Sequence, residues 1–320
     1  MPFPSAVDWA GRLFSLAVLV SVPATGPAAS LEPAAPREPV PAVVAAPAPA
    51  VAAPAARPAP HRDEPLVVAH RGASGYAPEN TLAAADAADA LGTTWVETDV
   101  QRTADGELVL MHDTTLERTT NAEVLFPDRA PWRVADFTAA EMARLDAGSW
   151  FGEEFAGEPV PTLTDFADRL ADNGQRLLLE IKSPASYPGI EADILDELRA
   201  AGWLGERHPG RRLVIQSFDA ASVRRVHELA PRVETGFLGT PAVADVPEYA
   251  EFADQINPRY RDLTADYVAD LQAVEGPHGE PVEVYAWTVN DGPTAVAVAE
   301  LGVDGIITNF PDVVRDALEE

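Results

Sequence analysis

Residues 66–100, LVVAHRGASGYAPENTLAAADAADALGTTWVETDV, contain two short apolar runs separated by a helical stretch. The runs LVVAH and WVETDV have the composition of β-strands, and the Ala- and Leu-rich segment between them favours a helix that ends near Gly92. The same alternation continues toward the C-terminus. It predicts a parallel sheet and, at this number of units, a closed TIM (β/α)8 barrel, with an open doubly wound sheet as the alternative.

Nine strand-like runs are present, although a barrel has eight strands. The second and third runs are too close for a helix between them, and Asp105-Gly106 is a strong signal for a two-residue hairpin turn. In such a hairpin the numbers of paired residues sum to 211, so His112 is expected opposite Asp99. The nine runs are LVVAH (66–70), WVETDVQ (95–101), LVLMHD (108–113), RLLLEIK (176–182), RLVIQSF (212–218), VETGFLG (233–239), DQINP (254–258), VEVYAWTV (282–289) and DGIITN (304–309).

The sequence before residue 64 differs in composition from the rest. Arg12 precedes a short apolar run that is followed by small residues, which is the layout of a secretory signal peptide over residues 1–30 and is too short to span a bilayer. A disordered apolar tail on a cytoplasmic protein is the alternative. Residues 31–63 are rich in Ala, Pro and Val without a period that could bury a face, which predicts an extended linker. We therefore expect a secreted or envelope-associated protein.

The folded part is expected over residues 64–320, which suits a single TIM barrel of about 250 residues. Within it, residues 119–161 interrupt the alternation. This segment is rich in Gly, Pro, Trp and Phe and has no sustained strand pattern. A segment of this length inside a compact domain predicts a small inserted subdomain beside the site.

The charge balance limits the classes of partner. The formal net charge is -28, with 51 Asp and Glu against 23 Lys and Arg, and no dense basic stripe is present. Nucleic acid is therefore not expected as a partner. The chain has no cysteine, which excludes disulfides, thiol catalysis and zinc–thiolate sites.

Three carboxylates follow the strand pattern. Glu97 and Asp99 are two residues apart in one strand, so their side chains point to the same face, and Glu180 ends another strand. Three carboxylates without Cys ligands describe a site for one hard divalent cation, Ca²⁺ or Mg²⁺. Ion-paired or solvated acids are the alternative interpretation.

Two histidines lie at the ends of different strands. His70 is followed by Arg71, and His112 is followed by Asp113. Near a carboxylate trio, one histidine can accept a proton from a nucleophile while the other donates one to a leaving group. The remaining histidines are expected to be surface or hydrogen-bonded core residues: His61, His208, His227 and His278.

Two cations accompany this group. Arg71 and Lys182 are expected at the same end of the barrel, where they suggest an anionic group, most naturally a phosphate. Charge compensation of the carboxylates is the alternative, and both can hold. Trp287 and Phe310 end the last strands, where an aromatic side chain either packs in the core or contacts substrate, and Gly72 is expected to permit a sharp turn.

Together these motifs resemble the glycerophosphodiester phosphodiesterase family over about residues 66–317. The order and spacing of the matching elements agree with the family pattern, which makes the resemblance specific. The elements are HRGASGYAPENT (70–81), ETDVQRTADGELVLMHDTTLERTTN (97–121), LDAGSWF (145–151), EPVPTL (158–163), LLLEIK (177–182), QSF (216–218), AWTVN (286–290) and DGIITNFP (304–311).

The resemblance implies a TIM barrel that hydrolyses a small-molecule glycerophosphodiester to glycerol 3-phosphate and an alcohol. By position it implies an acid/base pair, three divalent-metal ligands, substrate-contacting residues and two supporting residues. These are His70 and His112; Glu97, Asp99 and Glu180; Arg71 and Lys182; and Glu79 and Asn80. Trp287, at the end of a strand run, is a further candidate to contact substrate.

Two alternatives remain at this point. A lysophospholipase D or sphingomyelinase D-type barrel could share the same histidines and carboxylates, and would be distinguished by a long apolar groove and a membrane-facing loop, for which WFGEEF (150–155) is a modest candidate. A non-catalytic secreted module that binds phosphodiesters would require the loss of a catalytic residue or metal ligand. The sequence does not indicate the head group or the oligomeric state.

Overall fold

The computed structural model describes residues 64–204 and 212–320. The predicted signal peptide and linker lie outside the described residues, as do His61 and His208. Eight parallel strands form a closed barrel, because β1 pairs with both β2 and β9, and this confirms the TIM barrel over the open sheet. The eight strands are β1 (Leu66–Ala69), β2 (Trp95–Arg102), β4 (Arg176–Ile181), β5 (Leu213–Ser217), β6 (Glu234–Leu238), β7 (Gln255–Asn257), β8 (Glu283–Ala286) and β9 (Gly305–Thr308).

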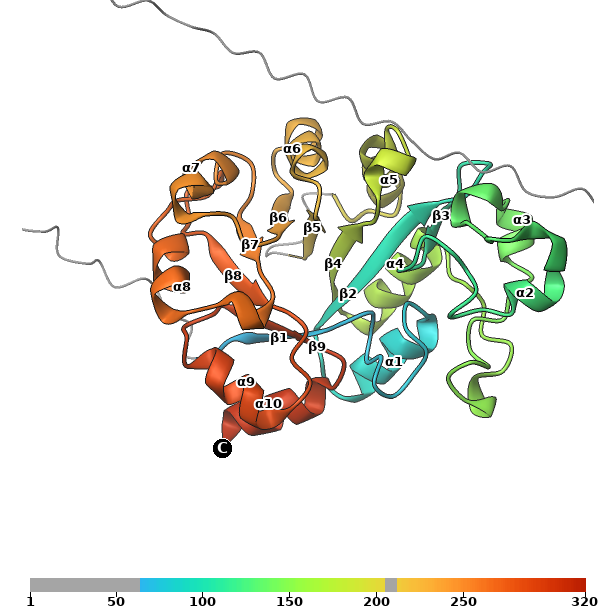
Figure 1. The fold of residues 1–320 in the computed structure, drawn as a ribbon, viewed down its shortest axis with the longest axis horizontal. Coiled ribbons are helices and arrows are strands. Elements are labelled where there is room, and N and C mark those ends of the chain that lie inside the picture. Colours follow the sequence, from blue (N-terminus) through green and yellow to red (C-terminus); the bar gives the residue numbers. More distant parts are fainter. Residues whose placement is uncertain (1–63, 205–211) are drawn as a thin grey trace, which may run out of the picture. The chain divides into compact units, whose positions relative to one another are not determined.

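Helices surround the strands, as Figure 1 shows. Five of them begin at a Ser/Thr/Asp-type cap whose side chain accepts a backbone N–H: Thr81, Thr162, Asp219, Thr264 and Asp291. The surrounding helices are α1 (Leu82–Ala90), α4 (Leu163–Asn173), α5 (Ile190–Ala200), α6 (Ala220–Leu229), α7 (Val246–Tyr249), α8 (Ala265–Gln272), α9 (Gly292–Ala299) and α10 (Pro311–Glu319).

The ninth strand, β3 (Leu108–Leu110), pairs antiparallel with β2 outside the ring, as the hairpin predicts. The predicted register is wrong by one residue, because paired numbers sum to 210: Gln101 faces Val109, and the N–H of Met111 bonds to the carbonyl of Asp99. The turn has three residues rather than two. The Gly106 N–H bonds to the Thr103 carbonyl, and Gly106 adopts a φ of 101°, a region that favours glycine.

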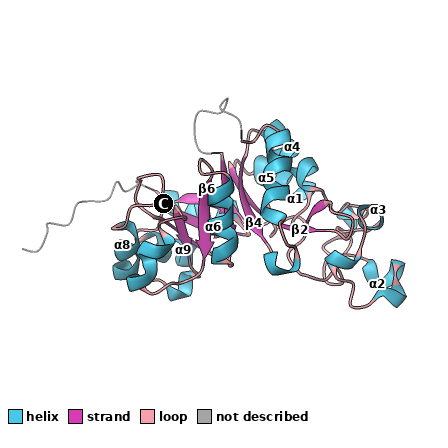
Figure 2. Ribbon diagram, turned by 90° about the horizontal axis from the view of Figure 1, so that it is seen from above, coloured by secondary structure: helices cyan, strands magenta, loops and turns pink. Residues whose placement is uncertain are grey.

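A small subdomain lies between β3 and α4. It contains the short helices α2 (Ala122–Leu125) and α3 (Ala139–Met142), and Figure 2 places both beyond β2, at the end opposite α8 and α9. The two ends of the subdomain segment lie side by side, because the Leu110 N–H bonds to the Pro161 carbonyl at 3.0 Å. It has an apolar core of its own, made of Val109, Met111, Leu116, Ala122, Val134, Phe137, Met142, Leu145, Ala147 and Val160.

The barrel interior is filled in layers. A buried apolar cluster draws one residue from each of six strands, and these can meet only inside the ring: Val68, Trp95, Leu178, Val214, Tyr285 and Ile307. Side chains two residues further along a strand point to the same face. The next interior layer, toward the carboxyl ends of the strands, is therefore His70, Glu97, Glu180, Gln216, Trp287 and Asn309. The apolar floor and the polar layer above it both follow from the strand period of two.

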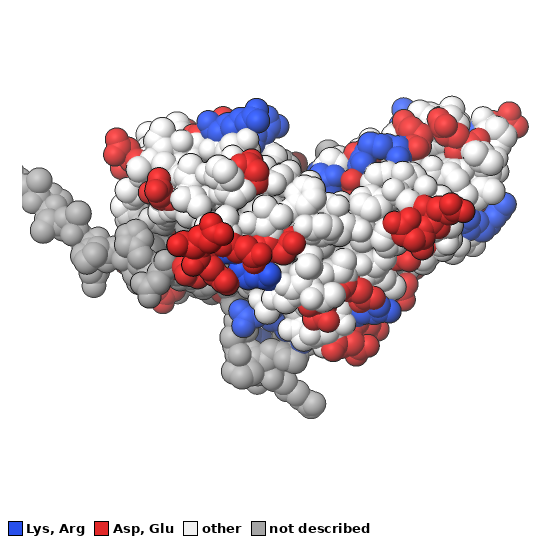
Figure 3. All heavy atoms as spheres, turned by 90° about the horizontal axis from the view of Figure 1, so that it is seen from below, with Lys and Arg blue, Asp and Glu red and all other residues white. Residues whose placement is uncertain are grey.

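The surface carries charge of both signs. On the face drawn in Figure 3, Asp and Glu side chains gather in several groups, while Lys and Arg form smaller, separate ones. Among the described residues, no helix has the length and apolar character needed to cross a bilayer.

Candidate active site

One cavity of about 340 Å³ opens at the carboxyl ends of the barrel strands. It brings together most of the predicted site residues, drawn from β1, β2, β4, β8 and the segment after β3. Its lining contains His70, Arg71, Glu97, His112, Glu180, Lys182 and Trp287. Six further lining residues were not predicted as site residues: Gln216, Phe218, Leu238, Arg259, Thr288 and Ile307.

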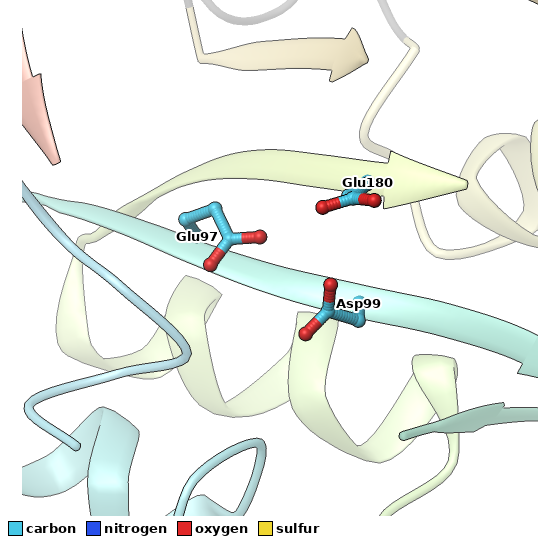
Figure 4. Close-up of side chains that lie close together, drawn as sticks. All are labelled: Glu97, Asp99 and Glu180. Atoms are coloured by element: carbon cyan, nitrogen blue, oxygen red, sulfur yellow. The ribbon is translucent and has the colours of Figure 1, made fainter. Parts of the chain in front are cut away.

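The three predicted carboxylates form one buried cluster, shown in Figure 4. Glu97 and Asp99 project from β2, and Glu180 projects from the neighbouring β4, where it is the register partner of Asp99. Each residue offers an oxygen that lies within 4.8 Å of the oxygens of the other two. Among the described residues this is the group with metal-ligand spacing.

The cluster perturbs the acidity of its members. Burial, and then the charges of Asp99 and Glu180, raise the pKa of Glu97 well above its usual range. Burial and the charge of Asp99 raise the pKa of Glu180 to about 8. Burial opposes ionisation of Asp99 as well, but Arg71 and Lys182 overcome it and lower the pKa of Asp99 to about 2. Like charges held this closely favour a cation among them.

The donor chemistry fits a hard divalent cation. The three groups offer carboxylate oxygens, which Ca²⁺ and Mg²⁺ prefer. The Oδ1 atom of Asp99 is buried and accepts no hydrogen bond from the described residues, and the Lys182 ammonium lies 3.7 Å from it. A buried carboxylate oxygen without a hydrogen bond lowers the stability of the fold unless a charged partner lies beside it. Glu97, Asp99 and Glu180 are thus the residues that could hold such an ion.

Arg71 and Lys182 line the cavity beside the carboxylates. The Arg71 guanidinium lies 2.8 Å from Glu79 and 3.3 Å from Asp99. The Lys182 ammonium lies 2.7 Å from Glu180. Burial opposes their charged forms, yet the surrounding carboxylates raise the pKa of both residues. The two cations therefore compensate the acids, as the alternative interpretation predicts, and also present positive charge to the cavity.

The turn after β1 positions Asp99 and the Arg71 side of the cavity. Gly72 has a φ of +79°, and a Cβ atom there would lie 2.5 Å from that of Ala84, so the position requires glycine. Asn80 also has a positive φ, and its amide holds Asp99: Nδ2 donates to the Asp99 carboxylate at 2.9 Å, and Oδ1 accepts the Asp99 N–H at 3.1 Å. Asn80 therefore orients one carboxylate from two sides.

His70 is held by the last strand. Its ring Nδ1 lies 2.7 Å from the Asn309 side-chain oxygen, and its backbone N–H bonds to the carbonyl of Thr308. With that oxygen as acceptor, Nδ1 carries the proton and Nε2 keeps a free lone pair. Burial, followed by the charge of Arg71, lowers the pKa of His70 to about 4. Asn309 was not identified from the sequence.

His112 is held differently. Its Nδ1 lies 2.7 Å from an oxygen of the Asp113 carboxylate. Its backbone is fixed by buried Gln101, whose amide donates to the carbonyls of Met111 and Asp113 at 2.7 Å each. The Tyr187 hydroxyl in turn donates to the Gln101 oxygen at 2.8 Å. Despite the shifted register, the hairpin carries His112 to the cavity.

Arg118 connects the two histidine-bearing segments, and it was not predicted as a site residue. Its guanidinium donates two hydrogen bonds to Glu79 and one to Asp113, at 2.5 Å for the latter. Glu79 also accepts from Arg71, and Asp113 bonds to His112. A continuous chain of charged hydrogen bonds therefore runs from the Arg71 side of the cavity to the His112 side. The sequence does place Arg118 close to His112, in the segment LERTT (116–120).

Aromatic side chains lie on one side of the cavity. Trp287 lines it and donates from its indole N–H to the Asn257 carbonyl at 2.8 Å. Phe218 packs edge-on against Trp287 with ring centroids 5.5 Å apart. Phe310 instead packs against Tyr76 and lies outside the cavity lining.

A family model described as the glycerophosphoryl diester phosphodiesterase family matches residues 70–313. A glycerophosphodiester phosphodiesterase of Caldanaerobacter subterraneus is 37% identical over 250 residues, which cover 77% of this chain and 95% of that protein. A glycerophosphodiester phosphodiesterase of Bacillus subtilis (strain 168) is 34% identical over 265 residues, covering 78% of this chain and 85% of that protein.

Solved structures are similar as well. An Oleispira antarctica phosphodiesterase, solved in complex with the product sn-glycerol-3-phosphate, is 29% identical with a TM-score of 0.67, covering 80% of this chain and 98% of that one. A glycerophosphodiester phosphodiesterase from Agrobacterium tumefaciens is 26% identical with a TM-score of 0.62, covering 79% of this chain and 99% of that one.

Proposed function

The chain belongs to the glycerophosphodiester phosphodiesterase family and is a phosphoric diester hydrolase, and we propose that it cleaves small glycerophosphodiesters to glycerol 3-phosphate and an alcohol by metal-assisted two-histidine catalysis. The observation that supports this most is the shared cavity. Two histidines, two cations and two of the three clustered carboxylates, Glu97 and Glu180, line one space of about 340 Å³.

The phosphate is proposed to bind between Arg71 and Lys182. Both cations are largely buried and point into the cavity, where water cannot screen them fully. A divalent cation held by Glu97, Asp99 and Glu180 would polarise the phosphoryl oxygens and neutralise charge that develops on them. Arg71 and Lys182 add fixed donors for the same oxygens.

The hydrogen-bond partners of the histidines suggest their roles. Nδ1 of His112 lies 2.7 Å from the Asp113 carboxylate, whereas Nδ1 of His70 lies 2.7 Å from the side-chain oxygen of the neutral Asn309 amide. Burial also lowers the pKa of His70 to about 4, so its ring is neutral near pH 7. We therefore assign His70 as the general base and His112 as the general acid.

Nε2 of His70 takes the proton from the attacking oxygen, which belongs to water or to the adjacent glycerol hydroxyl and forms a new bond to phosphorus. The bond between phosphorus and the alcohol oxygen breaks, its electron pair stays on that oxygen, and His112 protonates it. If the glycerol hydroxyl attacks first, water opens the cyclic phosphate in a second step with the histidine roles reversed.

Purified protein tests the proposal directly. Glycerophosphocholine, glycerophosphoethanolamine and glycerophosphoinositol are supplied with Ca²⁺ or Mg²⁺, and glycerol 3-phosphate is measured. Release from at least one substrate is expected. Lysophosphatidylcholine and sphingomyelin in the same panel represent the phospholipase D-type alternative; hydrolysis of these alone would contradict the proposal.

Export of the protein is proposed on the sequence alone. Arg12 and the apolar run after it have the layout of a signal peptide, and the Ala- and Pro-rich residues 31–63 suit a spacer. Expression of the full chain, followed by N-terminal sequencing of protein from the medium and envelope, tests this. Full-length protein confined to the cytoplasm would contradict it.

A further inference from the structure

A second hollow adjoins the catalytic cavity, and we propose that it binds the leaving alcohol and favours alcohols that carry an ammonium group. This inference rests on the proposed function and assigns the half of the substrate that differs between glycerophosphodiesters. We call the hollow the leaving-group groove. Its lining comprises residues 180–185 and 217–221.

The groove continues directly from the cavity. Glu180, Lys182 and Phe218 line both spaces, so a substrate with its phosphate at Lys182 can extend into either. The groove has a volume of about 560 Å³, against about 340 Å³ for the cavity. The glycerophosphate half is common to all substrates and suits the smaller space that holds the histidines. The variable alcohol then suits the larger one.

The charge of the groove favours a cation. It has three ionisable lining residues, and in the proposed complex two of them are committed, Glu180 to the divalent cation and Lys182 to the substrate phosphate. Asp219 is the third. Its Oδ1 accepts the N–H groups of Ala221 and Ser222, and its carboxylate forms no salt bridge with the described residues. The charge that remains is therefore negative.

The boundary between the two spaces is aromatic. Phe218 is 49% exposed, although it is a large apolar residue on a loop between β5 and α6. Its ring is braced edge-on by Trp287, with an interplanar angle of 88°. The electron-rich face of an aromatic ring attracts an ammonium group, and the Lys182 ammonium already lies 5.7 Å from the centroid of this ring. An exposed ring and a carboxylate without a salt bridge to the described residues therefore lie at adjacent positions, 218 and 219, and both attract an ammonium group.

The remaining lining supports the same choice. Pro184, Ala185, Ala220 and Ala221 offer small apolar surfaces, which suit methyl groups. Ser217 is buried, and its hydroxyl is committed to the carbonyl of Ile181 at 2.9 Å. A polyol such as inositol would need several hydrogen-bond partners, and beyond the Ser183 hydroxyl these side chains offer few. An anionic head group would be repelled by Asp219.

Asp219→Asn tests the charge without removing the helix cap. Asn caps helices about as well as Asp, so α6 keeps its N-terminal hydrogen bonds. We expect the ratio of kcat/KM for glycerophosphocholine to that for glycerophosphoinositol to fall about two- to fivefold. Phe218→Leu is expected to lower the same ratio by a similar factor. Asp291→Asn is the matched control, because Asp291 caps α9 at the same end of the barrel but lies outside the groove.

The outcomes separate the two proposals. An unchanged ratio in both groove variants, or an equal loss on both substrates, would overturn the groove assignment while the wild type still releases glycerol 3-phosphate. No release from any glycerophosphodiester by the wild type would instead overturn the proposed function. As an independent probe, choline chloride should inhibit hydrolysis of glycerophosphoinositol competitively in the wild type and more weakly in Asp219→Asn; equal inhibition in both would count against the groove.

Discussion

Arg118 donates two parallel hydrogen bonds to Glu79, from Nη2 to Oε1 at 2.7 Å and from Nη1 to Oε2 at 2.9 Å. These two bonds join Arg118, which lies in the segment after β3, to Glu79, which lies in the turn after β1. Because Glu79 also holds Arg71 and Arg118 also holds Asp113, the pair sets the distance between the phosphate-binding side and the proposed acid. We regard Arg118 as a positioning residue that does not itself contact substrate.

Arg118→Ala should lower kcat about ten- to a hundredfold with a smaller change in KM, since misplacement of a catalytic group by about 1 Å has such effects. Arg118→Lys should restore little, because an ammonium cannot reproduce the two-pronged bond. Steady-state kinetics with both variants checks this. Arg169→Ala is the control, since Arg169 pairs with Asp86 away from the cavity. A purely structural role predicts a lowered Tm with unchanged kcat.

His70→Ala and His112→Ala should each lower kcat at least about a hundredfold, because each removes one proton transfer. Asn309→Ala should cost less than His70→Ala, since it disturbs the ring orientation but leaves the base present. His278→Ala serves as the control, because its ring bonds to Asp254 and the Pro231 carbonyl outside the cavity. Near wild-type turnover in either active-site variant would remove that histidine from the mechanism.

Thorough chelation should abolish activity, and Ca²⁺ or Mg²⁺ should restore it. Binding can be measured without turnover: saturating cation at about a hundred times Kd should stabilise the fold by about 2.7 kcal/mol, or roughly 5–10 °C in Tm. Asp99→Asn and Glu180→Gln should lose most of that shift, because each removes a charged ligand from the cluster. Full activity and an unchanged Tm after chelation would exclude the cation from the mechanism.

Asp146 should make the stability of the subdomain depend on pH. Burial opposes ionisation of its carboxylate, but hydrogen bonds from Ser149, Gly148 and Gly157 lower its pKa to about 2. A depressed pKa means that this stabilisation is complete above the unfolded value near 4 and is lost as the pH falls toward 2. Asp146→Ala should therefore lower Tm by roughly 2–8 °C at pH 7. The gap to the wild type should narrow below about pH 3; a gap independent of pH would contradict the argument.

The barrel could be predicted from the sequence because its strands and helices are short, regular and repeated. Residues 66–100 already show one complete β–α–β unit, and every later strand run appears at its expected place. The interior layers follow from the period of two, which places Glu97 above Trp95 and Glu180 above Leu178. Helix α10, which follows the last strand, was not predicted from the sequence.

The site was only partly predictable, because its finer geometry depends on contacts between distant segments. Nothing local in the sequence shows that Asn309 meets His70, 239 positions away, or that Arg118 meets Glu79. The hairpin register failed for a different reason. Ala104, Asp105 and Gly106 form the turn together, and the Thr103 hydroxyl bonds to Asp105. The turn is therefore one residue longer than the two-residue turn that Asp105-Gly106 predicts.

The pairing of Leu110 with Pro161 has a consequence for how the enzyme can vary. The segment 111–160 begins and ends at one place on the barrel, so a change in its length alters the loop-closure cost only slightly. The subdomain could therefore be exchanged or shortened as a cassette between relatives. His112 lies just inside its first boundary, so a graft that cuts before residue 112 would replace the proposed acid and one that cuts after residue 112 would keep it.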